Sequence, residues 1–200
     1  MRGAVVVIGT SWGGLAALSE LIECLPANLP AAVVVVQHRA RDSESLLAAL
    51  LQDHSRLPVV EVDDKDLIEA GRIFVAPADY HLLVDGPTFS LSVDAPVRYS
   101  RPSIDVTFVS AADSYGVRAI GVVLTGANDD GARGLRRIVD RGGRAVVQRP
   151  DTAEVATMPN AALHLVPEAE CLRLGEIGPH VAQLATALAM APGAHSGGPA

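Results

Sequence analysis

Continuous runs of apolar residues alternate along this chain with segments in which apolar residues recur every three or four positions. The runs are rich in valine and other β-branched residues, which is typical of strands buried on both faces of a parallel sheet. They predict strands over residues 4–9, 31–38, 57–62, 71–77, 117–126 and 144–148. The segments between them predict helices over 13–25, 43–54, 101–116, 130–143 and 177–190, with helical turns over 152–163 that break near Pro159.

The helical segments carry apolar faces and residues suited to helix ends. Ser43 and Ser103 are expected to cap the helices over 43–54 and 101–116, because a serine oxygen accepts a hydrogen bond from a free amide of the first turn. In the helix over 13–25, the large apolar residues that share one face are expected to be buried, namely Leu15, Leu18, Leu21, Ile22 and Leu25.

One stretch departs from this alternation. In residues 81–93, two short alternating segments flank Asp85-Gly86, which is a strong signal for an antiparallel hairpin. The whole pattern predicts an α/β fold with a doubly wound, mostly parallel sheet flanked by helices and an antiparallel β-hairpin near residues 81–93. No linker or repeat interrupts residues 1–190, so one domain is expected, and the Gly/Pro-rich residues 191–200 predict a disordered tail.

Composition excludes several classes of protein. The net charge is −7 and no run of Lys and Arg occurs, which argues against a nucleic-acid groove. No stretch reaches the roughly 20 apolar residues of a membrane span, and the N-terminus lacks a signal-peptide pattern, so we expect a cytoplasmic protein without membrane insertion. Two cysteines make no disulfide framework. The histidines lack H-E-x-x-H or H-x-H spacing, so no metal site is expected.

The first apolar run opens into a glycine-rich loop, Gly9-Thr10-Ser11-Trp12-Gly13, for which two interpretations compete. A dinucleotide-binding loop has a second glycine at the position of Ser11 and an acidic residue at the end of the next strand. That strand ends instead in Gln37-His38, and the chain contains no G-x-x-x-x-G-K-[ST] motif. Both observations argue against a phosphate cradle, and no cofactor is expected.

The second interpretation is a nucleophile turn. The loop matches G-x-S-x-G between a predicted strand and a predicted helix, which places Ser11 at the N-terminus of that helix. His38 follows the next strand, and the carboxyl ends of neighbouring parallel strands meet at one edge of a sheet. His38 is therefore a candidate base for Ser11. The alternatives are that Ser11 only caps its helix and that His38 is structural.

A carboxylate is the third group that such a site requires. The loop after the strand over 117–126 carries Asp129 and Asp130, and either would orient the imidazole of His38, unless both only cap the following helix. The order serine, histidine, aspartate along the chain differs from the serine, aspartate, histidine order of α/β-hydrolases. The residues thus predict serine hydrolase chemistry on another α/β fold.

Five blocks of the sequence, from about residue 3 to 190, together resemble the catalytic domain of CheB-type chemotaxis protein-glutamate methylesterases: IGTSWGGLAAL, VVVVQH, RPSIDVTFVSAA, VVLTGANDDGARGL and TAEVATMPNAAL. The resemblance implies a parallel-sheet α/β domain that hydrolyses glutamate methyl esters on chemoreceptors and, in many members, deamidates receptor glutamines. It implies Ser11 as the nucleophile and His38 as the base. Because the family aspartate precedes the glycine of L-T-G-x-x-x-D-G, it implies Asp130 rather than Asp129 as the partner of His38.

The chain departs from the family pattern at the rim of this site. Trp12 stands where a small polar residue is common, and Ala127 stands where methionine is frequent. Arg39-Ala40 follows His38 in place of Met-Pro. The backbone amides of Trp12 and Ala127 are still expected to hold the oxyanion, since a backbone N–H does not depend on the side chain.

The resemblance also implies partners. The expected substrate is the cytoplasmic domain of a methyl-accepting chemoreceptor. Since the chain starts at the catalytic strand, we expect no fused receiver domain, and control by phosphorylation then requires a separate receiver-domain regulator. Arg98 and Arg101 are candidate contacts for an acidic receptor surface, or else surface charges that flank a helix. Two other functions stay open, a non-catalytic or repurposed receptor-binding regulatory module and a cytosolic esterase for small esters.

Overall fold

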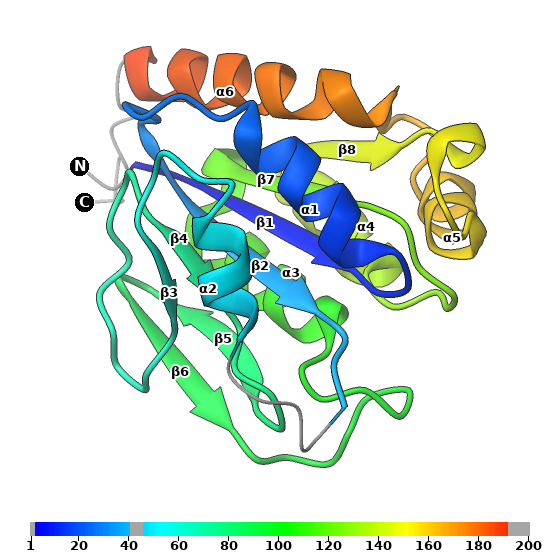
Figure 1. The fold of residues 1–200 in the computed structure, drawn as a ribbon, viewed down its shortest axis with the longest axis horizontal. Coiled ribbons are helices and arrows are strands. Elements are labelled where there is room, and N and C mark those ends of the chain that lie inside the picture. Colours follow the sequence, from blue (N-terminus) through cyan, green and yellow to red (C-terminus); the bar gives the residue numbers. More distant parts are fainter. Residues whose placement is uncertain (1–2, 41–45, 192–200) are drawn as a thin grey trace, which may run out of the picture.

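A computed structural model describes residues 3–40 and 46–191 (Figure 1). The predicted cap Ser43, with the start of its helix, lies outside the described residues, as does nearly all of the predicted tail. Within the described part, the order of strands and helices follows the predicted alternation. The chain therefore forms the α/β fold that the sequence predicts.

A seven-stranded parallel sheet forms the centre, in the order β3-β4-β2-β1-β7-β8-β9. The strands span Ala4–Thr10 (β1), Ala31–Gln37 (β2), Val59–Glu61 (β3), Ile73–Val75 (β4), Ala119–Val123 (β7), Arg144–Gln148 (β8) and Glu170–Leu172 (β9). The chain leaves β1 towards β2 on one side, and β7 pairs with β1 on the other side. This reversal next to β1 is a topological switch point, and α/β sheets bind ligands outside the carboxyl ends of their strands at such a point.

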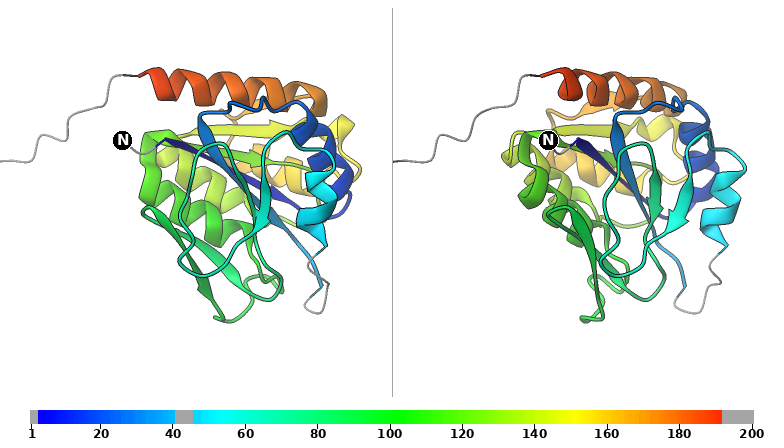
Figure 2. Two further views of the ribbon diagram at one scale, coloured as in Figure 1. Left: turned by 60° about the vertical axis from the view of Figure 1, so that its left-hand side comes forward. Right: turned by 90° about the vertical axis from the view of Figure 1, so that its left-hand side faces the viewer.

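Helices cover both faces of the sheet (Figure 2). One face packs against α1 (Gly14–Glu23), α2 (Leu47–Gln52) and α6 (Leu174–Met190), and the other against α3 (Ile104–Tyr115), α4 (Ala132–Asp140) and α5 (Thr157–Leu165). Side chains of β1 alternate between the two cores, with Val5 and Val7 on the α3 side and Val6 and Ile8 on the α1 side. Because α1 and α4 lie on opposite faces, the loops that follow β1 and β7 diverge at the carboxyl edge.

The predicted hairpin is confirmed. Strands β5 (His81–Asp85) and β6 (Thr88–Ser92) form a separate antiparallel sheet. Asp85 pairs with Thr88, so the two-residue turn is Gly86-Pro87, one residue later than the predicted Asp85-Gly86. The hairpin rests on α3, where the Thr107 hydroxyl donates to the carbonyl of Leu82 at 2.7 Å. The ring of Phe89 also packs against Phe74 of the main sheet, with centroids 5.0 Å apart. The hairpin thus extends the core and keeps α3 against the sheet.

The structure corrects three local predictions. Leu15 is 42% exposed, because the first turn of α1 lies at the carboxyl edge of the sheet. Pro159 does not break a helix, since it occupies the first turn of α5, where no intrahelical hydrogen bond is lost. The strand β9 was not predicted, because its residues Glu170, Cys171 and Leu172 do not form a continuous apolar run. The two short 3₁₀ turns, Gly116–Arg118 and Pro150–Thr152, likewise carry no clear signal.

Helices α3 and α4 approach each other closely at Gly134. A Cβ atom at this position would lie 2.4 Å from the Cβ of Phe108 and 3.1 Å from the carbonyl oxygen of Asp105. Neither neighbour is the free end of a flexible side chain, so only glycine fits. This contact fixes how the N-terminal ends of the two helices meet, and those ends lie beside the candidate site.

We therefore expect Gly134→Ala to destabilise the fold by about 1–3 kcal/mol through overpacking, although alanine is the better helix former by about 1 kcal/mol. Gly175→Ala is the matched control, because Gly175 is an exposed helical residue whose Cβ would meet only the end of the Glu20 side chain, at 3.3 Å. The control is expected to be neutral or slightly stabilising. Urea unfolding measures the free energy of unfolding of both variants. Equal effects would contradict the prediction, because they would show that α3 and α4 can move apart enough to accept a methyl group.

Candidate active site

Ser11 directly follows β1 at the carboxyl edge of the sheet. Its amide donates to the carbonyl of Thr125 at 3.0 Å, which ties the turn to the end of β7. Its carbonyl accepts hydrogen bonds from Gln37 Nε2 at 2.7 Å and from the amide of Gly14 at 3.0 Å. Gly13 precedes α1 with φ of 75°, a left-handed conformation that favours glycine. The turn is fixed by its backbone, which leaves the partly exposed Ser11 side chain available.

His38 lies beside Ser11 because of the strand register. Thr10 pairs with Gln37 in the parallel β1–β2 ladder, so the residues that follow each strand emerge side by side. The amide of His38 donates to the carbonyl of Thr10 at 3.1 Å. The imidazole is mostly buried, and its Nε2 donates to Asp130 Oδ2 at 2.8 Å. Because Nε2 is engaged, Nδ1 is the ring nitrogen left to act on a nucleophile.

The carboxylate of Asp130 is fully buried and binds four donors. Besides His38 Nε2, these are the Ser103 hydroxyl at 3.0 Å and the amides of Ile104 at 2.7 Å and Asp105 at 2.9 Å. The two amides belong to the first turn of α3, so Asp130 caps that helix from another part of the chain. Ser103 occupies the predicted cap position, but its hydroxyl donates to Asp130 rather than accepting from the helix.

These contacts decide the charge state of Asp130. Burial raises the pKa of the carboxyl group, but the hydrogen bonds from His38 and from the amides of Asp105 and Ile104 outweigh it. The pKa of Asp130 therefore lies below its ordinary value, and the group is ionised at neutral pH. An ionised carboxylate at this position keeps the imidazole of His38 protonated on Nε2 and oriented.

Asp105 forms the reciprocal contact. Its carboxylate accepts hydrogen bonds from the amides of Gly131 at 2.9 Å and Gly134 at 2.7 Å, at the N-terminus of α4. Burial raises the pKa of Asp105, the amide of Gly134 lowers it, and the charge of Asp130 raises it, with a net increase. Each of the two helices is thus capped by a carboxylate that comes from the other helix or from the loop before it.

The two adjacent aspartates of the β7–α4 loop have different contacts in the structure. Asp129 is exposed and forms an ion pair with Arg98, and among the described residues its carboxylate makes no hydrogen bond with His38. Asn128, in contrast, contacts the imidazole, with its Nδ2 at 3.4 Å from His38 Nδ1. Its Oδ1 accepts a hydrogen bond from the amide of Asp130 at 3.1 Å. Asn128 was missed from the sequence, where a polar residue in a loop gives no signal of its direction.

The two predicted oxyanion donors lie on the loops after β1 and β7. In the described part of the chain, the amides of Trp12 and Ala127 have no hydrogen-bond acceptor. The Trp12 indole is 66% exposed, and its Nε1 donates to Glu154 Oε1 at 3.0 Å. The ring is therefore held at the rim by Glu154, a residue that sequence reasoning did not identify. Ser11 itself stays partly exposed beneath this rim.

The two candidate arginines differ in their surroundings. The guanidinium of Arg101 contacts Asp79 and donates to the carbonyls of Val93 at 2.7 Å and Asp94 at 3.0 Å, so it fastens the segment before α3. Arg98 pairs with Asp129 in the loop that carries Asp130, which places its charge beside the site. Of the two arginines, Arg98 is therefore the one placed to contact a substrate.

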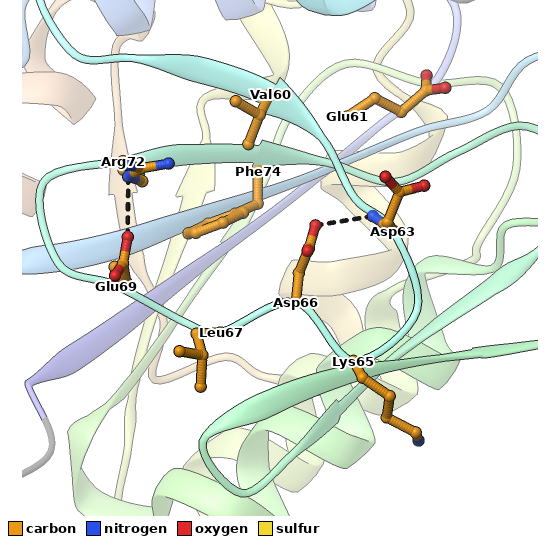
Figure 3. Close-up of a pocket in the computed structure, with 9 residues that line it drawn as sticks. All are labelled: Val60, Glu61, Asp63, Lys65, Asp66, Leu67, Glu69, Arg72 and Phe74. Atoms are coloured by element: carbon orange, nitrogen blue, oxygen red, sulfur yellow. Dashed lines mark hydrogen bonds and ion pairs between the residues drawn. The ribbon is translucent and has the colours of Figure 1, made fainter.

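Other features of the described residues do not suggest a second reaction centre. A hollow at the sheet edge, between β3, β4 and residues 62–72, is lined by charged side chains such as Glu69 and Arg72, which pair with each other at 3.0 Å (Figure 3). Within residues 3–40 and 46–191, no group of three or more His, Cys, Asp or Glu side chains is arranged to hold a metal ion. Both cysteines are free and exposed.

The sequence and the fold both match one protein family. The family model for CheB methylesterase matches residues 6–181, which is most of the chain. This chain belongs to the CheB methylesterase family. The CheB methylesterase catalytic domain of Thermotoga maritima superposes with a TM-score of 0.88 at 32% identity, over 92% of this chain and 100% of that one.

Curated relatives carry related names. A putative protein-glutamate methylesterase/protein-glutamine glutaminase of Leptospira interrogans is 43% identical over 164 residues, which cover 82% of this chain and 85% of the relative. Protein-glutamate methylesterase/protein-glutamine glutaminase 2 of Anaeromyxobacter dehalogenans is 44% identical over 164 residues, which cover 82% of this chain and 48% of that protein. This CheB-family chain thus corresponds to nearly the whole of one relative and about half of the other.

The low pKa of Asp130 predicts an acid-sensitive fold. Its contribution to stability is complete above the unfolded-state pKa of about 4, and it is lost as the pH falls through the lower folded-state pKa. We expect the free energy of unfolding to fall on acidification below about pH 4, and to fall less steeply in Asp130→Asn. Urea unfolding across this range measures both slopes. Asp129→Asn is the control for the loss of one carboxylate from the same loop, and equal slopes in all three proteins would contradict the assignment of the effect to Asp130.

Proposed function

We propose that this chain is a protein-glutamate methylesterase that uses Ser11 as nucleophile, His38 as general base and Asp130 to orient the imidazole. The observation that carries the proposal is the 2.8 Å contact between His38 Nε2 and the buried Asp130, formed beside the serine of a G-x-S-x-G turn. Membership of the CheB methylesterase family and the names of its relatives support the reaction class. Those names also support deamidation of glutamine side chains as a second activity of the same site.

The geometry suggests how the groups would act. His38 Nδ1 takes the proton of Ser11, since Nε2 is bound to Asp130. Ser11 Oγ then attacks the ester carbonyl, and the free amides of Trp12 and Ala127 hold the oxyanion, where one such donor contributes about 10²–10³ in rate. The imidazolium returns its proton to the leaving methoxide, and methanol departs. Water, activated by the same imidazole, hydrolyses the acyl-enzyme and restores Ser11.

The surroundings of Trp12 bear on the alternative of a non-catalytic module. A large side chain next to the nucleophile would support that alternative if it covered Ser11. The indole is instead anchored outward on Glu154, and Ser11 stays partly exposed. This arrangement favours a working hydrolase. A small-ester esterase would use the same groups, so the choice between the two substrates depends on the rim rather than on the triad.

For the substrate we propose the cytoplasmic domain of a methyl-accepting chemoreceptor, with Arg98 as a contact for its acidic surface. A receiver-domain protein is proposed as a separate regulator, and the reaction is placed in the cytoplasm. None of the helices that the structure describes combines the length and the apolar character of a membrane span.

A fluorophosphonate probe tests the nucleophile and its orienting carboxylate. We expect covalent labelling at Ser11 and release of methanol from methylated receptor. Asp130→Asn should lower the rate of methanol release by up to about 10⁴-fold, because the imidazole loses its tautomer and orientation. Asp129→Asn should stay within about threefold of wild type, since the Asp129 carboxylate is exposed and pairs with Arg98 rather than with His38. Folded wild-type protein that takes up no probe would refute the nucleophile, and equal losses in the two variants would refute Asp130.

The role of Arg98 is tested by comparing the kinetics of its variant on methylated receptor and on a small methyl ester. Arg98→Ala should raise KM for methylated receptor about two- to fivefold, the size of an exposed charge contact, and leave turnover of a small methyl ester unchanged. Arg133→Ala is the charge-matched control, since Arg133 is an exposed residue of α4. A rise in KM that is the same in both variants would indicate only a net-charge effect.

A further inference from the structure

Both ring nitrogens of His38 already have partners in the structure. Nε2 donates to Asp130 at 2.8 Å, and Nδ1 lies 3.4 Å from Asn128 Nδ2. The hydroxyl of Ser11 makes no hydrogen bond with any described residue. The nitrogen that the proposed mechanism needs for Ser11 is therefore paired with a side-chain amide instead.

The direction of the Asn128 amide is set by its other end. Its Oδ1 accepts a hydrogen bond from the amide of Asp130 at 3.1 Å, and only an acceptor satisfies that donor. The NH₂ group must then face His38, and it donates to Nδ1. This assignment agrees with the opposite side of the ring, where the proton sits on Nε2 because Asp130 accepts it.

Two donors thus compete for one lone pair. A neutral imidazole has a single acceptor nitrogen, so Nδ1 binds either the Asn128 amide or the Ser11 hydroxyl, but not both in good geometry. A distance of 3.4 Å is beyond the usual range of an N–H to acceptor hydrogen bond, which makes the Asn128 contact weak and easily displaced.

We propose that Asn128 is a positioning residue that restrains the nucleophile: its amide occupies His38 Nδ1 in the free enzyme and yields that nitrogen to Ser11 when an ester binds. The proposal rests on the proposed function, because it takes Ser11 as the nucleophile and His38 as its base. It concerns a residue outside the triad. It predicts that Ser11 of the free enzyme reacts more slowly than it would if the Asn128 amide did not occupy His38 Nδ1.

Proton transfer makes the displacement necessary. Once His38 has taken the Ser11 proton, Nδ1 becomes a donor and would face the NH₂ donors of Asn128. The amide has to turn away before or during this step, and Oδ1 then exchanges the amide of Asp130 for another partner. Activation of Ser11 is therefore coupled to a rearrangement of the loop that carries Asp130.

Two substitutions at Asn128 give opposite predictions. Asn128→Ala removes the competing donor, and fluorophosphonate labelling of Ser11 should become about three- to tenfold faster, the factor that corresponds to one weak neutral hydrogen bond. Asn128→Asp keeps an acceptor for the Asp130 amide but presents a carboxylate to Nδ1, which favours a proton there. Labelling should then become at least about tenfold slower near neutral pH. A purely structural role would slow both variants.

The second readout is the tautomer of His38, measured by ¹⁵N NMR on histidine-labelled protein. The chain has six histidines, and a His38→Gln variant assigns the resonance. We expect wild type to carry its proton on Nε2 with a hydrogen-bonded Nδ1, and the Nδ1 resonance to shift in Asn128→Ala. Asn160→Ala is the control, since Asn160 is an exposed residue of α5, and thermal melts establish that each variant is folded.

The outcomes separate this inference from the proposed function. Faster labelling of Asn128→Ala with a shifted Nδ1 resonance supports the restraint. Labelling that is equal or slower in folded Asn128→Ala overturns it, while labelling of the wild type at Ser11 still supports the proposed nucleophile. If no protein is labelled, the proposed function fails, and an unchanged Nδ1 resonance in Asn128→Ala would overturn the restraint as well.

Discussion

The buried negative charge of Asp130 is the interaction around which this site is arranged. One carboxylate binds the catalytic candidate His38, the Ser103 hydroxyl and two amides of the first turn of α3. The positive end of the α3 dipole stabilises that charge, so the helix contributes to the site through its backbone amides. Asp105 repeats the arrangement on α4, and Gly134 lets the two helices meet closely enough for the exchange.

The site divides into a fixed frame and a variable rim. Strand register places Ser11 next to His38, and the capped helices place Asp130 behind the imidazole. The rim, in contrast, is built by loop residues such as Trp12 and Asn128, whose side chains are held by only one or two hydrogen bonds each among the described residues. This division agrees with the comparison to the Thermotoga maritima catalytic domain, in which the fold is closely similar, with a TM-score of 0.88, although the sequences are only 32% identical. Loops change more readily in sequence than the strands and helices that carry them.

The sequence predicts the frame better than the rim, for physical reasons. The β-branched runs that give β1 and β2, and the Asp85-Gly86 pair that predicts the hairpin, are local signals, and local signals can be recognised in a single sequence. Asp129 and Asp130 are neighbours in one loop, and their difference arises only because Asp130 turns towards a helix that begins at Ile104. The contacts of Asn128 with His38 and of Trp12 with Glu154 join distant parts of the chain, and no periodic pattern in the sequence predicts them.

The double use of Asp130 has a consequence for descendants of this protein that lose their activity. Selection for a folded domain would retain the aspartate in such a lineage, because α3 needs its cap whether or not an ester is hydrolysed. The Ser11 side chain, which bonds to no described residue, carries no comparable structural duty. In a set of such sequences, the serine therefore distinguishes working enzymes from inactive copies, and the aspartate does not.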